Sequence, residues 1–269
     1  MENVVGQEKL VKALESYTIQ TAPRTMLFLG EHGCGKHWIA ASFAEHLDID
    51  AEFIDKQVTT EKLVEYYQYP LQRLYVIDLT EIDPKQQNKF LKFIEEPSSN
   101  MYIILIAESE IGILPTILNR CKKFIFEKYT IDQLKEFGWM SKCSDELMYS
   151  ICSTPGQIID INMDTLEDAY NLCETIVTKA PKAKYSNIIK ISTKINCGND
   201  FKKIDFDIFF RVLIYVAFTN YKETGNGFSF DLYKYLIERQ AKRLNKSIAK
   251  ESYLLSFLDN LWEIAQRWN

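Results

Sequence analysis

A short apolar run, Thr25–Leu29, leads into a glycine-rich loop and then into a helical pattern, and this arrangement limits the fold more than any other feature. The loop has the spacing G-x-x-x-x-G-K, with Gly30, Gly35 and Lys36 in the fixed positions. The chain has only 10 glycines in 269 residues, and a third one, Gly33, lies in the same loop. Backbone amides of such a loop point at phosphate oxygens, and the helix N-terminus and the lysine add positive charge. The sequence therefore predicts a phosphate-binding loop, with an ordinary tight turn and an incidental lysine as the alternative.

Short apolar runs alternate with helical patterns over the first 126 residues. Runs of this length are typical of strands in a parallel sheet that helices cover on both faces. Asp83 and Pro84 have the residue types that begin a helix. The alternation predicts an α/β fold class with a parallel sheet. The expected strands are Thr25–Leu29, Ala51–Ile54, Leu74–Ile77, Tyr102–Ile106 and Lys123–Phe126, and the expected helices cover 5–18, 35–46, 60–67 and 84–95.

The distribution of proline divides the chain. All seven prolines lie at or before Pro181, and the last 88 residues contain none. Because proline breaks helix interiors, this stretch favours long helices, and its apolar residues recur at three- and four-residue steps. We expect a P-loop nucleotide-binding domain over 1–126, a small helical domain over 127–180 with Thr130 as a helix cap, and an all-helical domain over 181–269.

Two positions beside the loop differ from those of a hydrolysing P-loop site. His37 stands where a serine or threonine hydroxyl would ligate Mg²⁺, and imidazole is a poor ligand for this hard cation. Asp78 ends an expected strand and is placed to hold Mg²⁺ through water. The next residue, where a glutamate would activate water, is Leu79, and Glu81 lies two residues further on. The pattern predicts a site that binds ATP but binds Mg²⁺ weakly or not at all and hydrolyses poorly.

Composition excludes several classes of protein. The six cysteines occur singly and no CxxC is present, so we expect neither a zinc site nor a disulfide framework, and no metal site of any other kind. No apolar run reaches the roughly 18 residues of a membrane helix, and the N-terminus lacks the pattern of a signal peptide. We therefore expect a cytoplasmic protein without a membrane partner.

The net charge of −5 excludes a uniformly basic surface but not a basic patch. Five cations near the C-terminus would form one stripe on a single helix, suited to DNA phosphates or to an acidic partner. A solvated helix face is one alternative, and a helix that ends at Asn245, which would split the stripe, is another. Tyr66, Tyr67 and Tyr69 are interpreted as packing or interface aromatics. The five cations are Arg239, Lys242, Arg243, Lys246 and Lys250.

Several phrases after Asp78 resemble the clamp-loader branch of the AAA+ ATPases. Phe90–Pro97 is similar to the family's LLK-x-LEEP phrase, and Ile113–Cys121 is similar to its LLPTILSRC phrase. Val4–Gln7 resembles the family's opening, which packs near the adenine. The resemblance covers roughly 1–165 and implies an AAA+ domain, a small helical lid domain and a helical collar domain for oligomerisation. It also implies an ATP site formed by Val5, Gly30, Gly33, Cys34, Gly35, Lys36, His37 and Asp78.

The resemblance assigns a separate role to Arg120. In the family, the arginine of the SRC phrase reaches the ATP of a neighbouring subunit as an arginine finger in trans. Asn119 replaces the usual serine before it, and Gln157 occupies the position of a family arginine that touches the γ-phosphate in cis. The family's zinc-binding cysteines are absent between His37 and Asp78. From the residues alone, without the resemblance, Arg120 is interpreted as a surface arginine that pairs with a local acid.

A degraded site with a retained trans arginine resembles the delta-prime type of clamp-loader subunit in bacterial DNA polymerase III. This resemblance implies DNA replication as the process, and as partners the other subunits of a hetero-pentamer, a sliding clamp and primer–template DNA. One alternative is an active gamma/tau-like ATPase in which His37 and Glu81 replace the usual groups. Another is an interaction scaffold whose loop is a relic.

Overall fold

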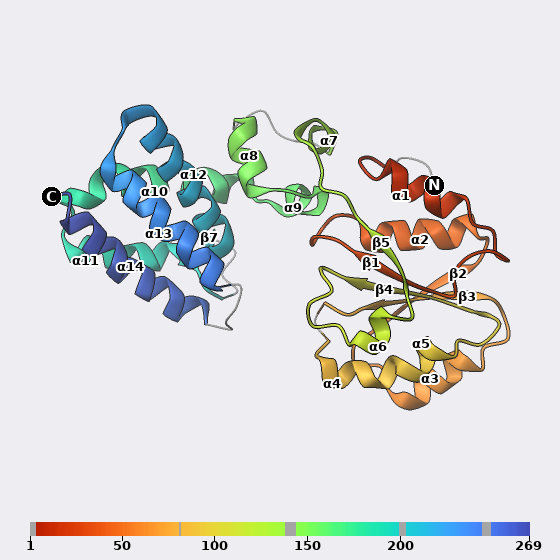
Figure 1. Cartoon of the computed structure of the whole chain (residues 1–269). Helices are drawn as coiled ribbons and strands as arrows, with labels where there is room; N and C mark the ends of the chain where they lie inside the picture. Colours follow the sequence, from red (N-terminus) through yellow and green to blue (C-terminus); the bar gives the residue numbers. More distant parts are fainter. Residues whose placement is uncertain (1–3, 81, 138–143, 199–202, 244–248) are drawn as a thin grey trace. The chain divides into compact units, whose positions relative to one another are not determined.

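The computed structural model describes all residues except 1–3, 81, 138–143, 199–202 and 244–248. The chain divides into two compact units (Figure 1). The first comprises Met1–Trp139 and Ser153–Ile159, and the second comprises Met140–Cys152 and Asp160–Asn269. This division does not follow the expected boundaries at 126/127 and 180/181, and the three-domain organisation stays a prediction.

The first unit is built on a five-stranded parallel sheet in the order β2-β3-β4-β1-β5. All five expected strands form, and the α/β fold class is confirmed. The central strands β1 and β4 are buried along their whole length, as apolar runs covered on both faces should be. Figure 1 shows α1 and α2 on one face of the sheet and α3 to α6 on the other. The strands are β1 (Thr25–Leu29), β2 (Asp50–Ile54), β3 (Arg73–Asp78), β4 (Met101–Ala107) and β5 (Lys122–Ile125).

Two helices of the first unit begin at the caps that the sequence predicts. Asp83 accepts hydrogen bonds from the amides of Lys85 and Gln86, with Pro84 in the first turn. Thr130 forms a capping box with Gln133. The helices are α1 (Glu8–Glu15), α2 (Lys36–His46), α3 (Thr60–Tyr67), α4 (Pro84–Gln87), α5 (Leu91–Glu95), α6 (Pro115–Leu118) and α7 (Ile131–Lys135), with α9 (Pro155–Asp160) almost wholly in this unit.

The prediction of a single helix over 84–95 is wrong in one respect. A 3-10 turn, η1 (Asn88–Phe90), separates α4 from α5. Gln87, Phe90 and Phe93 are all buried at a three-residue spacing. A 3-10 turn places residues at this spacing directly above one another, so the break lets one edge of the segment enter the core.

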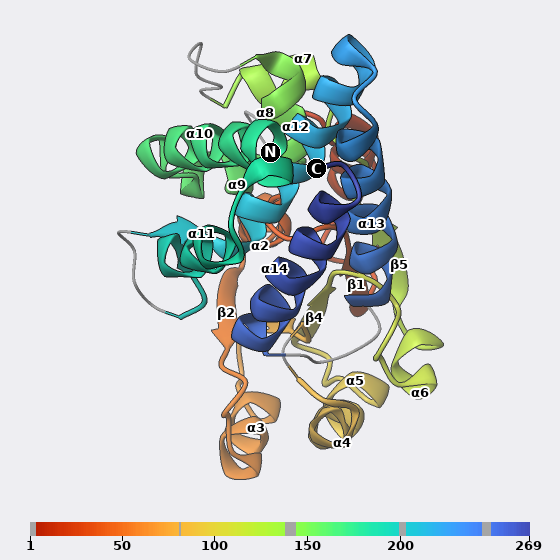
Figure 2. The ribbon, with the colours of Figure 1, turned by 90° about the vertical axis from the view of Figure 1, so that its left-hand side faces the viewer.

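The second unit is mainly helical. The aromatic residues expected at helical spacing lie at its centre, where Phe206, Phe209 and Phe210 contact Phe257 and Tyr253 of α14. Helices α12, α13 and α14 lie side by side (Figure 2). The helices are α8 (Asp145–Ile151), α10 (Met163–Lys179), η2 (Ala180–Lys182), α11 (Tyr185–Ile189), η3 (Lys190–Lys194), α12 (Phe206–Thr224), α13 (Gly227–Arg243) and α14 (Lys250–Gln266).

The helical character expected for 181–269 is confirmed, with one addition. Two short strands, β6 (Ile195–Asn196) and β7 (Ile204–Asp205), pair in parallel. Two-residue strands are too short to show any periodicity, so the sequence carries no signal for them. Within the part of the chain that the structure describes, no helix has the length and apolar character needed to span a membrane.

Candidate functional site

The glycine-rich loop joins the carboxyl end of β1 to α2. Gly33 and Gly35 adopt φ values of +77° and +91°, a left-handed backbone that residues with a Cβ rarely adopt. Gly35 is the N-cap of α2 and supplies no side chain to the first amides of this eleven-residue helix. The amides at this helix end are therefore directed toward the loop, as the phosphate-binding prediction requires.

Lys36 is only 6% exposed although it carries a full charge. Its ammonium donates to the carbonyl oxygens of Gly30, at 2.6 Å, and of Glu31, at 2.8 Å. The loop is thus curled around its own lysine. Cys34, also buried in the loop, has its thiol pKa raised by burial, so it is a neutral packing group there.

The segment before and within α9 packs on the loop. The amide of Gly156 donates to the carbonyl of Gly33 at 2.9 Å, and the buried Thr154 hydroxyl donates to the carbonyl of His32 at 2.8 Å. A Cβ on Gly156 would lie 2.7 Å from the Cα of Gly33, so the two backbones approach as closely as glycine permits. Gln157, expected in place of a cis arginine, accepts from the amide of Ser153 at 2.9 Å.

A second set of contacts connects the N-terminal segment to the loop. The Tyr129 hydroxyl donates to the carbonyl of Cys34 at 3.0 Å. Gly6, at φ +82°, packs on the Tyr129 ring, where a Cβ would be 2.6 Å from a ring carbon. Gln7 exchanges two hydrogen bonds with the backbone of Glu127. The half-buried Val5 therefore belongs to a segment that reaches the loop through Tyr129.

Asp78 and His37, 41 residues apart in sequence, are brought together at the loop. The His37 Nε2 lies 3.2 Å from the Asp78 Oδ2, and the Thr80 amide donates to Asp78 at 2.9 Å. Burial alone would raise the pKa of Asp78, but the hydrogen bonds from His37 and Thr80 outweigh it and hold that pKa below its usual range. Leu79 is buried, and Glu81 lies outside the described residues.

The residues present do not fit a magnesium ion. Mg²⁺ requires oxygen ligands in a near-octahedral arrangement, whereas the Asp78 carboxylate here faces an imidazole nitrogen. Among the described residues, no group of three or more His, Cys, Asp and Glu side chains could hold a metal ion.

Arg120 lies at the other edge of the sheet. The glycine-rich loop follows the carboxyl end of β1, whereas Arg120 precedes the amino end of β5, which pairs with β1 in parallel. A five-residue strand separates these edges by about 16 Å. Arg120 is 43% exposed, its Nη1 donates to the carbonyl of Thr116 at 2.9 Å, and its Nη2 lies 3.3 Å from Glu95. The sequence leaves open whether Arg120 pairs with an acid of its own chain, and the structure shows that it does, with Glu95.

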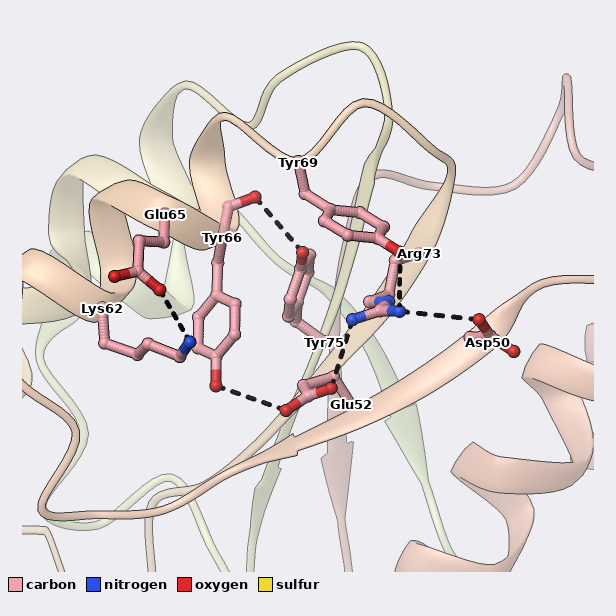
Figure 3. Close-up of polar contacts among 8 residues, drawn as sticks. All are labelled: Asp50, Glu52, Lys62, Glu65, Tyr66, Tyr69, Arg73 and Tyr75. Carbon is pink, nitrogen blue, oxygen red and sulfur yellow. Dashed lines mark hydrogen bonds and ion pairs between the residues drawn. The ribbon is translucent and has the colours of Figure 1, made fainter.

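The amino edge of the sheet also carries a polar network that the sequence did not reveal (Figure 3). Arg73 donates to Glu52 at 3.3 Å and to the Tyr69 hydroxyl at 3.0 Å, and its guanidinium lies 3.5 Å from Asp50. Tyr66 donates to Glu52 at 3.3 Å. Tyr66 and Tyr69 therefore have local polar partners in addition to the packing role predicted for them.

The prediction that the basic residues form one stripe on a single helix is wrong. Helix α13 ends at Arg243 and a separate helix, α14, begins at Lys250. The Arg239 guanidinium stacks 4.2 Å from the Tyr253 ring centre, and Lys250 pairs with Asp207 at 3.1 Å. Lys246 lies outside the described residues, as do the side chains of Lys242 and Arg243.

Comparison with known proteins gives one sequence match. Residues 60–130, about a quarter of the chain, match the family model described as DNA polymerase III, delta subunit. No curated protein sequence matches the chain.

Solved structures give matches of low identity with TM-scores below 0.5. The Thermotoga maritima RuvB Holliday junction branch migration motor is 14% identical, with a TM-score of 0.47 over 83% of this chain and 78% of that chain. An arginine-to-alanine variant of that RuvB is 17% identical, with a TM-score of 0.46 over 62% of this chain; the chain spans 64% of its length, less than two thirds. In sequence, residues 60–130 resemble the DNA polymerase III delta-subunit family, over the stretch that holds Asp78, Glu95 and Arg120.

Proposed function

We propose that this chain is a delta-prime-type subunit of a DNA polymerase III clamp loader. It assembles with other clamp-loader subunits into a hetero-pentamer that places a sliding clamp on primer–template DNA during replication. Its own loop holds ATP without hydrolysing it efficiently. Arg120 completes the ATP site of an adjacent subunit.

The position of Arg120 is the observation that carries this proposal. Arg120 and the chain's own glycine-rich loop lie at opposite edges of the sheet, which are separated by the length of one strand, about 16 Å. A guanidinium stabilises charge on a transferred γ-phosphate only when it is near that phosphate. An exposed arginine at this edge is better placed to serve the ATP of a neighbouring subunit than its own.

The environment of the loop supports the second part of the proposal. The carboxylate of Asp78 is engaged by His37, and the following side chain is a buried leucine that cannot accept a proton from water. The loop still presents the N-terminus of α2, whose partial positive charge favours phosphate oxygens. Phosphate binding and poor hydrolysis are compatible with these contacts.

The proposal is tested in a clamp loader reconstituted from this chain and the ATPase subunits of its source. Arg120→Ala is expected to remove the DNA-stimulated ATPase of the one site that depends on it, because a trans arginine accounts for a factor of about 10³–10⁵ at such a site. Arg120→Lys keeps the charge but not the planar fork and should recover little. Complex assembly by size-exclusion chromatography is the control for folding.

Lys36→Ala in the same complex separates the alternatives. If the chain's own site does not hydrolyse ATP, Lys36→Ala leaves the ATPase rate of the complex unchanged, whereas Arg120→Ala lowers it. The reverse result would identify an active gamma/tau-like ATPase. An unchanged rate in both variants would contradict the proposal.

A further inference from the structure

Glu95 and Arg120 meet at the amino edge of the sheet although 25 residues separate them. Glu95 is the last residue of α5, shortly before β4 begins, and Arg120 follows α6 and precedes β5. The Glu95 Oε1 lies 3.3 Å from the Arg120 Nη2. The Thr116 carbonyl accepts from Nη1 at 2.9 Å. The guanidinium is therefore held from two sides, by a carboxylate and by a backbone carbonyl.

Both residues stand on elements that the same hydrophobic core anchors. Phe93 and Ile94, next to Glu95, are buried, and so is Ile117, three residues before Arg120. All three belong to one cluster of buried side chains, and α5 contacts α6. A close-packed core resists displacement, so the position of the Glu95 carboxylate relative to Arg120 is set by packing as well as by charge.

The pair contributes little to folding stability. The side chains are 36% and 43% exposed, and exposed ion pairs are weak because water and salt screen them. A carboxylate in the last turn of a helix also gains nothing from the helix dipole, whose negative end is there. The placement of Glu95 is thus better explained by what it does to Arg120 than by what it does for α5.

We propose that Glu95 is a positioning residue for Arg120, which rests on the proposed function in trans. An exposed arginine samples many rotamers, and selecting one of them costs conformational entropy when the side chain engages a phosphate. Glu95 and the Thr116 carbonyl fix the guanidinium beforehand. The hydrogen bond to Thr116 uses one N–H of Nη1, and the contact with Glu95 is an ion pair at Nη2, so most of the five N–H donors of the guanidinium remain for phosphate oxygens.

The experiment uses the reconstituted clamp loader and compares three variants of this chain. Glu95→Ala removes the carboxylate, Glu95→Gln keeps an acceptor oxygen without the charge, and Glu96→Ala removes a neighbouring exposed carboxylate as a matched control. DNA-stimulated ATPase is measured as kcat and as KM for ATP. The melting temperature and complex assembly are measured in parallel, because a purely structural role would change those values.

Glu95→Ala is expected to lower the kcat of the Arg120-dependent site about tenfold, since misplacing a catalytic group by about 1 Å can cost up to about 100-fold. KM, melting temperature and assembly should stay at their wild-type values. Glu95→Gln should retain more activity than Glu95→Ala, and Glu96→Ala should match the wild type.

A double variant decides whether Glu95 acts through Arg120. In the Arg120→Ala background, Glu95→Ala should have no further effect on the rate. The inference is overturned if Glu95→Ala leaves kcat unchanged or raises it, or if it lowers the rate equally with and without Arg120. If Arg120→Ala itself has no effect, the proposed function fails, which is a separate outcome.

Discussion

Replacing Gln87 tests whether a buried polar side chain holds the first unit together. Gln87 ends α4 and is 1% exposed. Its Nε2 donates to the carbonyls of Ile82, at 3.0 Å, and Gly112, at 2.8 Å, and its Oε1 accepts from the amide of Leu114 at 3.0 Å. The side chain thus joins α4 to the segment that leads into α6.

The expected loss of stability follows from these three hydrogen bonds. Each contributes about 1 kcal/mol net, and an amide or carbonyl left buried without a partner costs about 1–3 kcal/mol. Gln87→Ala is therefore expected to lower the free energy of unfolding by about 3 kcal/mol or more. Gln87→Leu keeps most of the volume, so it separates the loss of hydrogen bonds from the formation of a cavity, and it should be similarly destabilising.

Urea unfolding followed by circular dichroism measures the change, and hydrogen exchange at the Leu114 amide reports it locally. Gln86→Ala is the matched control, because Gln86 is the same residue type at the adjacent, exposed helix position. Surface substitutions of this kind usually stay within about 0.5 kcal/mol. If Gln87→Ala cost no more than Gln86→Ala, the structural role assigned to this side chain would be refuted.

Two further predictions concern the loop contacts and pH. Gly156→Ala places a Cβ 2.7 Å from the Cα of Gly33, a backbone atom that cannot rotate away, so a loss of about 1–3 kcal/mol is expected in thermal unfolding. Gly198→Ala, with no atom within 4 Å, is the control, and equal melting temperatures would contradict the close approach. Burial raises the pKa of Tyr75 to about 12 from its ordinary value of 10. Between these values the unfolded state loses a proton that the folded state keeps, so stability falls as pH rises, by about 1.4 kcal/mol per pH unit. The free energy of unfolding, measured with urea at pH 9 and pH 11, should fall less between these two pH values in Tyr75→Phe than in the wild type. An equal fall in both proteins would contradict the raised pKa of Tyr75.

Local patterns were good guides to the secondary structure of the first unit. The five expected strands form because each is an apolar run of the length that a buried parallel strand needs. The caps at Asp83 and Thr130 also form, because capping depends on residues within one turn. The sequence does not predict the break at η1, which depends on how buried side chains pack, or the pair β6–β7, whose two-residue strands are too short to show a period.

The candidate site could be located from sequence only in part. The loop from Gly30 to Lys36 was visible because its chemistry lies within seven consecutive residues. Two contacts were not visible in the sequence because their residues are far apart in it. His37 and Asp78 are 41 positions apart, and Glu95 and Arg120 are 25 positions apart. The basic stripe failed for a related reason, because Arg239, Lys242 and Arg243 lie on one helix and Lys250 lies on another.

The sequence by itself determined the order of strands and helices along the chain and the curl of the glycine-rich loop, because periodicity, capping and glycine torsions are local properties. Only the tertiary structure decided which edge of the sheet each functional side chain occupies. Parallel pairing of β1 with β5 places the loop at one edge and Arg120 at the other, and this follows from long-range strand pairing that no short stretch of sequence encodes.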